Sequence, residues 1–325
     1  MGADATRERG LGAKIYLKGL WDNAGMLVVF IALFLGLSLF VDNFFTWVNM
    51  VGLALSVSSV GMVACTMLFC LASGDFDLSV ESIVAFAGVL AAVVINHTGN
   101  VATGICAGIL AGGAIGFFNG FVIAILRINA LIATLASMQI VRGLGFIVSG
   151  GIAVGVSNPG FFALGTGAFL KIPNPVWITI GCFIVFGFLL NKTTFGPNTL
   201  AIGGNREAAR LAGIPVTRIK ILIFGLQGLM AGFTGVVMAS RMTSGQPNSS
   251  VGFSLDVISA CVLGGVSLTG GVGTIVGTVV GVLIMGTVQN AMNLLNTPTF
   301  YQYVARGAIL LAAVLFDQLR RRRDT

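Results

Sequence analysis

The sequence has little charge and no long polar stretch. Asp, Glu, Lys and Arg make up only 9% of its 325 residues, whereas soluble domains contain about 25%. Hydrophobic residues account for 56%, and the mean hydropathy is +0.98. Apolar runs long enough to cross a bilayer as a helix, about 20 residues, recur along the chain and lack the strict alternation of barrel strands. The sequence therefore predicts an all-α polytopic membrane protein.

Several kinds of chemical site are also missing. The single histidine, His97, has no companions at metal-ligand spacing, so we expect no metal site. No G-x-x-x-x-G-K-[ST] motif is present, so the chain lacks that route to ATP binding. The five cysteines all fall in apolar runs and are interpreted as small core residues rather than disulfide partners. No His, Asp and Cys constellation supports an enzyme.

The apolar runs predict about ten transmembrane spans within a single transmembrane domain, 25–317. A segment 1–24 precedes this domain and a basic tail, 318–325, follows it. The glycine-rich segments 73–79 and 264–273 can also be interpreted as broken or re-entrant helices, which leaves the count open. The expected spans are 25–41, 51–72, 78–96, 101–125, 131–149, 175–191, 219–240, 253–268, 271–290 and 300–317.

The distribution of basic residues predicts the orientation. An even number of spans places both ends on one side, and basic residues cluster beside spans on the cytoplasmic side. Under this topology only Lys171 and Arg241 lie outside, and both termini are cytoplasmic. No aromatic and basic face suits nucleic acid. The residues counted as cytoplasmic are Arg7, Arg9, Lys14, Lys18, Arg127, Lys192, Arg206, Arg210, Arg218, Lys220 and Arg320 to Arg323.

An internal repeat is indicated by two matching sets of glycines, which we also expect to pack helices closely. Each set leads to an asparagine, Asn119 or Asn290, and then to an Arg-Gly pair at 142–143 or 306–307. Upstream, 76–80 parallels 253–257. The copies start on opposite sides, which indicates an inverted repeat and a central pathway, although glycine-rich spans can also resemble one another by composition. The two sets are Gly108, Gly112 and Gly116, and Gly273, Gly277 and Gly281.

Polar groups beside the apolar runs are candidates for the pathway. Asp75 and Asp77 are either functional groups at membrane depth or caps of the next helix. The amides could bind sugar hydroxyls or join helices. Arg142 and Arg306 either pair with Asp77, Glu81 or Asp256, or extend to the membrane surface. The candidate pathway residues are Asp75, Phe76, Asp77, Ser79, Asn119 and Asn290.

A short polar helix is predicted within 203–215, between two apolar spans. Asn205 is a good N-cap, 207–212 contains strong helix formers, and Gly213 with Pro215 ends the helix. A helix outside the membrane is suited to dock into a groove on another protein.

This stretch resembles the coupling loop of bacterial ABC importer permeases of the ribose, arabinose and xylose group. The segment 74–80 resembles their other recurrent motif, and 61–65 with 67–73, 240–247 and 290–296 are similar to L-arabinose permeases. The resemblance covers 25–317. Arg206 stands where such proteins often carry an acidic residue.

The resemblance implies a multi-pass inner-membrane homodimer surrounded by lipid. A cytoplasmic tandem ATPase subunit, using ATP and Mg²⁺, would dock on the coupling loop 192–218, and a periplasmic binding protein would deliver a pentose, L-arabinose being expected. The chain itself would bind no cofactor. The halves would alternate between inward-facing and outward-facing states. The implied coupling residues are Gly204, Asn205, Glu207, Ala208, Ala209 and Gly213.

An ion-coupled secondary sugar transporter is the alternative, because inverted repeats and broken helices also occur in that class. Two features favour the ABC importer. A secondary transporter does not need the cytoplasmic helix, and the spans contain no clear relay of carboxylates.

Overall fold

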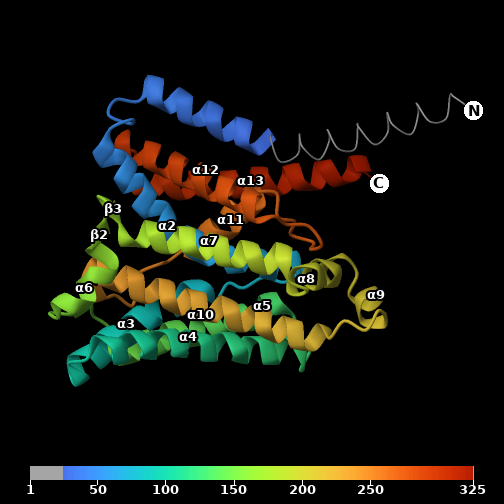
Figure 1. The fold of residues 1–325 in the computed structure, drawn as a ribbon, viewed down its shortest axis with the longest axis horizontal. Helices are drawn as coiled ribbons and strands as arrows, with labels where there is room; N and C mark the ends of the chain where they lie inside the picture. Colours follow the sequence, from blue (N-terminus) through green and yellow to red (C-terminus); the bar gives the residue numbers. More distant parts are fainter. Residues whose placement is uncertain (1–24, 325) are drawn as a thin grey trace, which may run out of the picture.

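The computed structural model describes residues 25–324, which are almost wholly helical (Figure 1). A first helix over Gly25–Phe40 is followed by α2 (Trp47–Ala72), α3 (Val80–Thr98), α4 (Val101–Ala124), α5 (Ala130–Ser149), α6 (Pro159–Thr166), α7 (Asn174–Lys192), α8 (Phe195–Gly204), α9 (Arg206–Leu211), α10 (Val216–Met242), α11 (Phe253–Leu263), α12 (Ile275–Leu294) and α13 (Thr299–Asp324). The segment 1–24, with Arg7, Arg9, Lys14 and Lys18, lies outside the described residues, as do the side chains of Arg320 to Arg323.

The helices follow the predicted spans. Each of the ten apolar stretches carries a helix. Within the described residues 25–324, seven helices are long and apolar enough to cross a membrane, namely α2, α3, α4, α5, α7, α10 and α12. The apolar helices Gly25–Phe40, Phe253–Leu263 and Thr299–Leu315 are shorter. The polytopic helical fold is therefore confirmed, whereas ten as the number of spans stays a prediction. The span expected to reach residue 268 ends at Leu263.

Local capping signals explain where several helices begin and end. The Asn100 side chain accepts hydrogen bonds from the backbone N–H groups of Ala102 and Thr103 at the start of α4, and Asn129 caps α5 in the same way. Gly99 ends α3 and Gly150 ends α5 in the left-handed conformation, which favours glycine. Such caps satisfy backbone groups that the helix leaves unpaired.

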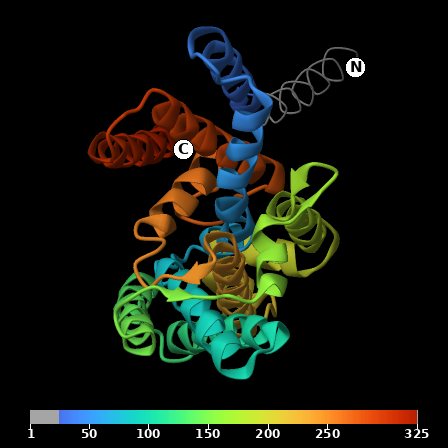
Figure 2. The same ribbon diagram turned by 90° about the vertical axis from the view of Figure 1, so that its left-hand side faces the viewer.

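Two ends of the molecule can be distinguished along its long axis (Figure 1). The α9 end carries α8, α9 and the last described turn of α13. The α6 end carries α6 and two small antiparallel pairs, β1 (Val154–Gly155) with β4 (Ser244–Gly245), and β2 (Ala168–Phe169) with β3 (Ile172–Pro173). Figure 2, viewed from the α6 end, shows α13 and the first helix on the opposite side from α4.

Two sets of four helices repeat the same order of contacts. Helix α3 packs on α4 and α5, as α11 packs on α12 and α13, while α10 packs on α4 and α2 packs on α12. Helices α2 and α10 run in opposite directions, because Lys220 near the start of α10 meets Asp75 just after α2, while Arg241 near its end meets the carbonyl of Leu55 near the start of α2. Opposed equivalent helices are what an inverted repeat requires.

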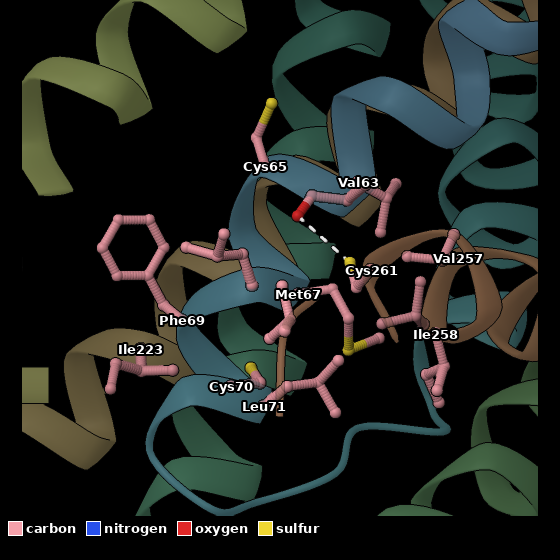
Figure 3. Close-up of a cluster of buried hydrophobic side chains, with 14 of the residues drawn as sticks. Val63, Cys65, Met67, Phe69, Cys70, Leu71, Ile223, Val257, Ile258 and Cys261 are labelled. Atoms are coloured by element: carbon pink, nitrogen blue, oxygen red, sulfur yellow. Dashed lines mark hydrogen bonds between the residues drawn. The ribbon is translucent and has the colours of Figure 1, made fainter. Parts of the chain in front are cut away.

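The main core lies where α2, α10 and α11 meet (Figure 3). Cys65, Met67 and Phe69 of α2 are fully or almost fully buried there. The thiol of Cys261 donates a weak hydrogen bond, 3.7 Å, to the carbonyl of Ala64. Buried free thiols behave as small apolar groups.

The predicted role of the cysteines as core residues is confirmed for Cys65, Cys70 and Cys261, which are buried. Cys182 is only partly buried, and Cys106 is exposed on α4, so the expectation was wrong for Cys106. An exposed apolar residue on a membrane helix contacts lipid rather than water, so an apolar run does not distinguish the core from the lipid-facing surface.

Candidate functional site

The predicted polar helix is present as α9, which projects at the α9 end of the molecule (Figure 1). The Asn205 side chain accepts hydrogen bonds from the backbone N–H groups of Glu207 (3.1 Å) and Ala208 (3.0 Å), as the N-cap prediction requires. The helix ends before Gly213, whose φ of +82° favours glycine. Both predicted boundaries are thus confirmed.

The side chains of α9 are mostly exposed. Ala209 is its buried residue, whereas Leu211 is 76% exposed. Glu207 and Arg210 form an ion pair at 2.6 Å on the surface. The hydrogen bond from Arg210 lowers the pKa of the Glu207 carboxyl. An exposed pair of this kind stabilises a fold little, so these side chains are free to contact a partner.

A basic pocket of about 850 Å³ lies between α9, the turn after α4 and the start of α10. Its lining includes Arg127, Arg206, Arg210, Arg218 and Glu207. Glu207 already pairs with Arg210, so positive charge dominates. The pocket therefore complements an acidic surface.

The last turn of α8 contacts the two non-helical segments that follow α2 and α11. Gly203 packs directly against the carbonyl of Ala72 and the backbone nitrogen of Gly271, where no side chain would fit. The N–H of Gly271 in turn donates to the carbonyl of Ala72 at 2.9 Å. The breaks after α2 and after α11 therefore meet beside the end of α8. A Cβ at Gly204 would point into free space, although its backbone lies beside Gly271.

The structure brings together most of the predicted pathway residues. Asp77 accepts hydrogen bonds from the backbone N–H (2.9 Å) and hydroxyl (2.5 Å) of Ser79. The Ser79 hydroxyl also accepts from the Asn119 amide at 2.9 Å. These three side chains are buried, and Asp77 retains one buried oxygen without a hydrogen-bond partner. Such a network in a low-dielectric interior orders the segment before α3.

Phe76, partly buried, is joined to α5 through its carbonyl, which accepts from Thr134 at 3.5 Å. Asn290 lies elsewhere, because it exchanges two amide hydrogen bonds, 2.8 and 3.0 Å, with Asn49 between the end of α12 and the start of α2. It thus joins two helices, which is the common use of amides in membranes.

Asp75 forms a buried ion pair with Lys220 of α10, with the Lys220 ammonium nitrogen 2.7 Å from a carboxylate oxygen of Asp75. Neither Asp75 nor Asp77 is the N-cap of α3, which is Ser79. The sequence predicts Lys220 only as a cytoplasmic charge and does not predict this pairing. Its signal was a lysine inside an apolar run, where an ionised group is costly without a partner.

The arginine pairings left open by the sequence are decided by the structure. Arg142 donates to the Glu81 carboxylate at 2.8 Å, and Arg306 donates to Asp256 at 3.2 Å. Glu81 and Asp256 occupy the first turns of α3 and α11, and Arg142 and Arg306 belong to α5 and α13. Each half thus carries the same kind of pair, and neither arginine takes Asp77 as its partner.

Glu81 also joins the two halves. Its carboxylate accepts from the backbone N–H of Gly252 (2.9 Å) and the Ser254 hydroxyl (3.2 Å), while Arg142 donates to the carbonyls of Pro247 and Ser249, both at 3.3 Å. A carboxylate is favourable at a helix N-terminus because of the helix dipole. The beginnings of α3 and α11 therefore meet, which the sequence did not predict. The Gly, Pro and Ser content of 245–252 indicates a loop before α11, but it does not indicate which residues that loop contacts.

The glycine stripes lie at close helix contacts, with one difference. Gly108, Gly112 and Gly116 face α10, and a Cβ at Gly112 would lie 2.5 Å from the carbonyl oxygen of Gly228. Gly277 and Gly281 pack against the end of α11. Gly273 precedes α12 and has space for a methyl group, so it is not part of a helix stripe. Close approach of small residues is typical of membrane helices.

Comparison with known proteins gives consistent matches. Residues 49–314 match the family described as branched-chain amino acid transport system / permease component. The chain is 62% identical over 303 residues to the L-arabinose transport system permease protein of Escherichia coli, covering 93% of this chain and 92% of that protein. It is 61% identical to the L-arabinose ABC transporter permease protein of Azospirillum brasilense, with 93% and 90% covered.

A more distant relative is the ribose import permease protein of Bacillus subtilis, which is 39% identical, with 94% of this chain and 95% of that protein covered. No solved structure matches the chain. The family description names amino acids while these relatives are named for sugars, so family membership by itself does not decide the substrate.

Proposed function

Because this chain belongs to the branched-chain amino acid transport system permease family and is an ABC sugar permease of the bacterial inner membrane, we propose that it carries L-arabinose into the cytoplasm by alternating access, driven by a separate ATPase. The 62% identity to the L-arabinose permease of Escherichia coli is the observation that carries the substrate. Opposed equivalent helices around a shared centre support alternation of two halves.

The ATPase partner is supported by the α9 end. Helix α9 is capped, exposed and adjoined by the basic pocket, so it offers a firm contact to an acidic surface. In this proposal α9 is cytoplasmic, together with both termini. ATP and Mg²⁺ act in the partner, and this chain binds neither. Gly204, Asn205, Glu207, Ala208, Ala209 and Gly213 form or flank the contact.

The remaining partners follow from the other surfaces. The α6 end, with its short strands and loops at 150–174, is the place for a periplasmic sugar-binding protein. Exposed apolar side chains such as Ile132, Ile147 and Ile184 face lipid or a second copy of this chain. We propose a homodimer of permeases on one tandem ATPase.

The test is uptake of labelled L-arabinose into vesicles that contain this chain, its ATPase and its binding protein, with and without internal ATP. Uptake should require ATP and both partners. Gly213→Pro should lower it at least about tenfold, because proline cannot adopt the φ of +82° that ends α9. Glu207→Ala removes the partner of Arg210 and tests the exposed contact.

Asp42→Ala is the matched control, because Asp42 is an exposed acid between the first helix and α2, away from α9. It should transport normally. Uptake by the chain alone, driven by an ion gradient and indifferent to Gly213→Pro, would replace this proposal with a secondary transporter.

A further inference from the structure

Helix α10 carries an ion pair close to α9. Lys220 and Asp75 are 2.7 Å apart, and their side chains are only 6% and 11% exposed. Four residues, 212–215, separate the end of α9 from the start of α10. Lys220 therefore lies in the second turn after the connection. A buried pair of this kind holds its two segments together, because separating the charges leaves each one without a partner.

The connection from α9 to α10 is hydrogen-bonded along its length. The N–H groups of Gly213 and Ile214 donate to the carbonyls of Arg210 and Ala209, both at 3.1 Å. The N–H of Ile219 donates to the carbonyl of Pro215, also at 3.1 Å. These hydrogen bonds tie the connection to the end of α9 and to the first turn of α10, so a displacement of α9 is passed towards Lys220.

The other end of α9 leads to the same segment. Gly203 packs against the carbonyl of Ala72 without room for a side chain, and a Cβ at Gly270 would lie 2.8 Å from the Cα of Gly203. The segment 73–79 is thus contacted on one side by Gly203, in the last turn of α8, and on the other side by Lys220. Tight packing transmits displacement because it leaves no space to absorb it.

The segment 73–79 passes directly into the centre of the molecule. Ser79 joins it to Asn119 of α4, and Glu81 in the first turn of α3 holds Gly252 and Ser254 at the start of α11. A displacement of 73–79 therefore reaches the beginnings of α3 and α11. Packed networks with two discrete arrangements can carry such coupling between distant sites.

We propose that Lys220, through its ion pair with Asp75, transmits displacement of α9 to the segment 73–79 and so to the facing N-termini of α3 and α11. This inference rests on the proposed function, because it assumes that a partner moves α9. Lys220 is a positioning residue: it acts on the pathway through Asp75. Its removal should separate ATP hydrolysis from sugar movement.

The experiment measures ATP hydrolysis and L-arabinose uptake in vesicles holding the permease, the ATPase and the binding protein. The principal variant, Asp75→Asn with Lys220→Met, removes the pair and leaves no unpaired charge buried. We expect this variant to assemble and hydrolyse ATP, while the sugar taken up per ATP falls about tenfold. Exchanging the charges, Asp75→Lys with Lys220→Asp, should recover part of that ratio.

The matched control is Arg241→Met, which removes a basic side chain at the opposite end of α10, where Arg241 donates to the carbonyl of Leu55 at 3.3 Å. It should leave the sugar taken up per ATP within about twofold of the unchanged protein, even if the yield of complex falls. A purely structural role for Lys220 would lower hydrolysis and uptake together and leave their ratio constant.

A constant ratio in the Asp75 and Lys220 double variant, at any level of activity, would overturn the inference. So would an equal loss of sugar taken up per ATP in the control variant Arg241→Met. Absence of ATP-driven uptake by the unchanged complex is a separate outcome, because it would overturn the proposed function and this inference with it.

Discussion

Single charged residues have different roles here according to their burial. Glu207 and Arg210 form a pair that is 65% exposed on each side chain, so solvent screens it and the pair contributes little to stability. Lys220 and Asp75 are buried, so neither can lose its partner without a large penalty. The same two charge types therefore form an exposed pair on α9 and a buried pair between α10 and the segment after α2.

The Glu207 carboxyl provides a prediction at this scale. Its pKa is lowered below the ordinary value of 4.5, chiefly by the hydrogen bond from Arg210. The stabilising contribution of a lowered pKa is present above the unfolded value and is lost as the pH falls through the folded value. Between pH 5 and pH 8, roughly, the pair should stay ionised and α9 should keep one charge pattern.

Arg210→Met should raise the pKa of Glu207 towards its ordinary value. A carbon-detected NMR titration of glutamate-labelled protein in detergent measures it, and Arg241→Met, at the other end of α10, is the control. An unchanged pKa in Arg210→Met would show that the ion pair is absent in solution.

At the scale of elements, the first turns of α3 and α11 differ in the partners of their acidic residues. Glu81 receives hydrogen bonds from Arg142, Gly252 and Ser254, so it joins α3 to α5 and to the start of α11. Asp256 has Arg306 as its ion-pair partner, within one half of the repeat. The two halves are therefore related in pattern, and Glu81 adds hydrogen bonds from α3 to the start of α11.

Glu81→Ala should destabilise the protein by about 3–5 kcal/mol, because it leaves the Arg142 guanidinium without its carboxylate and the backbone N–H of Gly252 without its acceptor. Asp256→Ala should cost less, since Arg306 is more exposed than Arg142. Thermal unfolding in one detergent, at equal protein concentration, compares the two. Equal losses would contradict the role of Glu81 as the residue that joins the halves.

At the scale of the whole molecule, the α9 end and the α6 end should face opposite sides of the membrane. Helices α4, α7 and α10 lie along the axis that joins these ends (Figure 1). The basic pocket lies at the α9 end, and basic residues favour the cytoplasmic side.

Labelling with a membrane-impermeant maleimide tests this orientation in a Cys106→Ser background, which removes the exposed native thiol. A cysteine replacing Leu211 at the end of α9 should react only in inside-out vesicles. A cysteine replacing His97, exposed near the end of α3, should react only in right-side-out vesicles. Reaction of both from the same side would show that the topology is wrong.

Sequence by itself determined the helices, the caps and the existence of α9, because each depends on signals within a few residues. Apolar runs predict spans, and Asn205 with Gly213 bounds α9 by local hydrogen bonding and backbone conformation. Even the repeat is visible in spacing, since Arg142 and Arg306 recur after matched glycine sets.

Only the tertiary structure decided which charges meet. Lys220 and Asp75 are far apart in sequence, as are Glu81 and Gly252, and a local pattern carries no record of a partner elsewhere in the chain. It also decided that Gly273 lies in a loop, that Asn290 pairs with Asn49, and that Cys106 is exposed. The physical reason is that burial and pairing belong to the packed helices together, whereas hydropathy and capping belong to each segment alone.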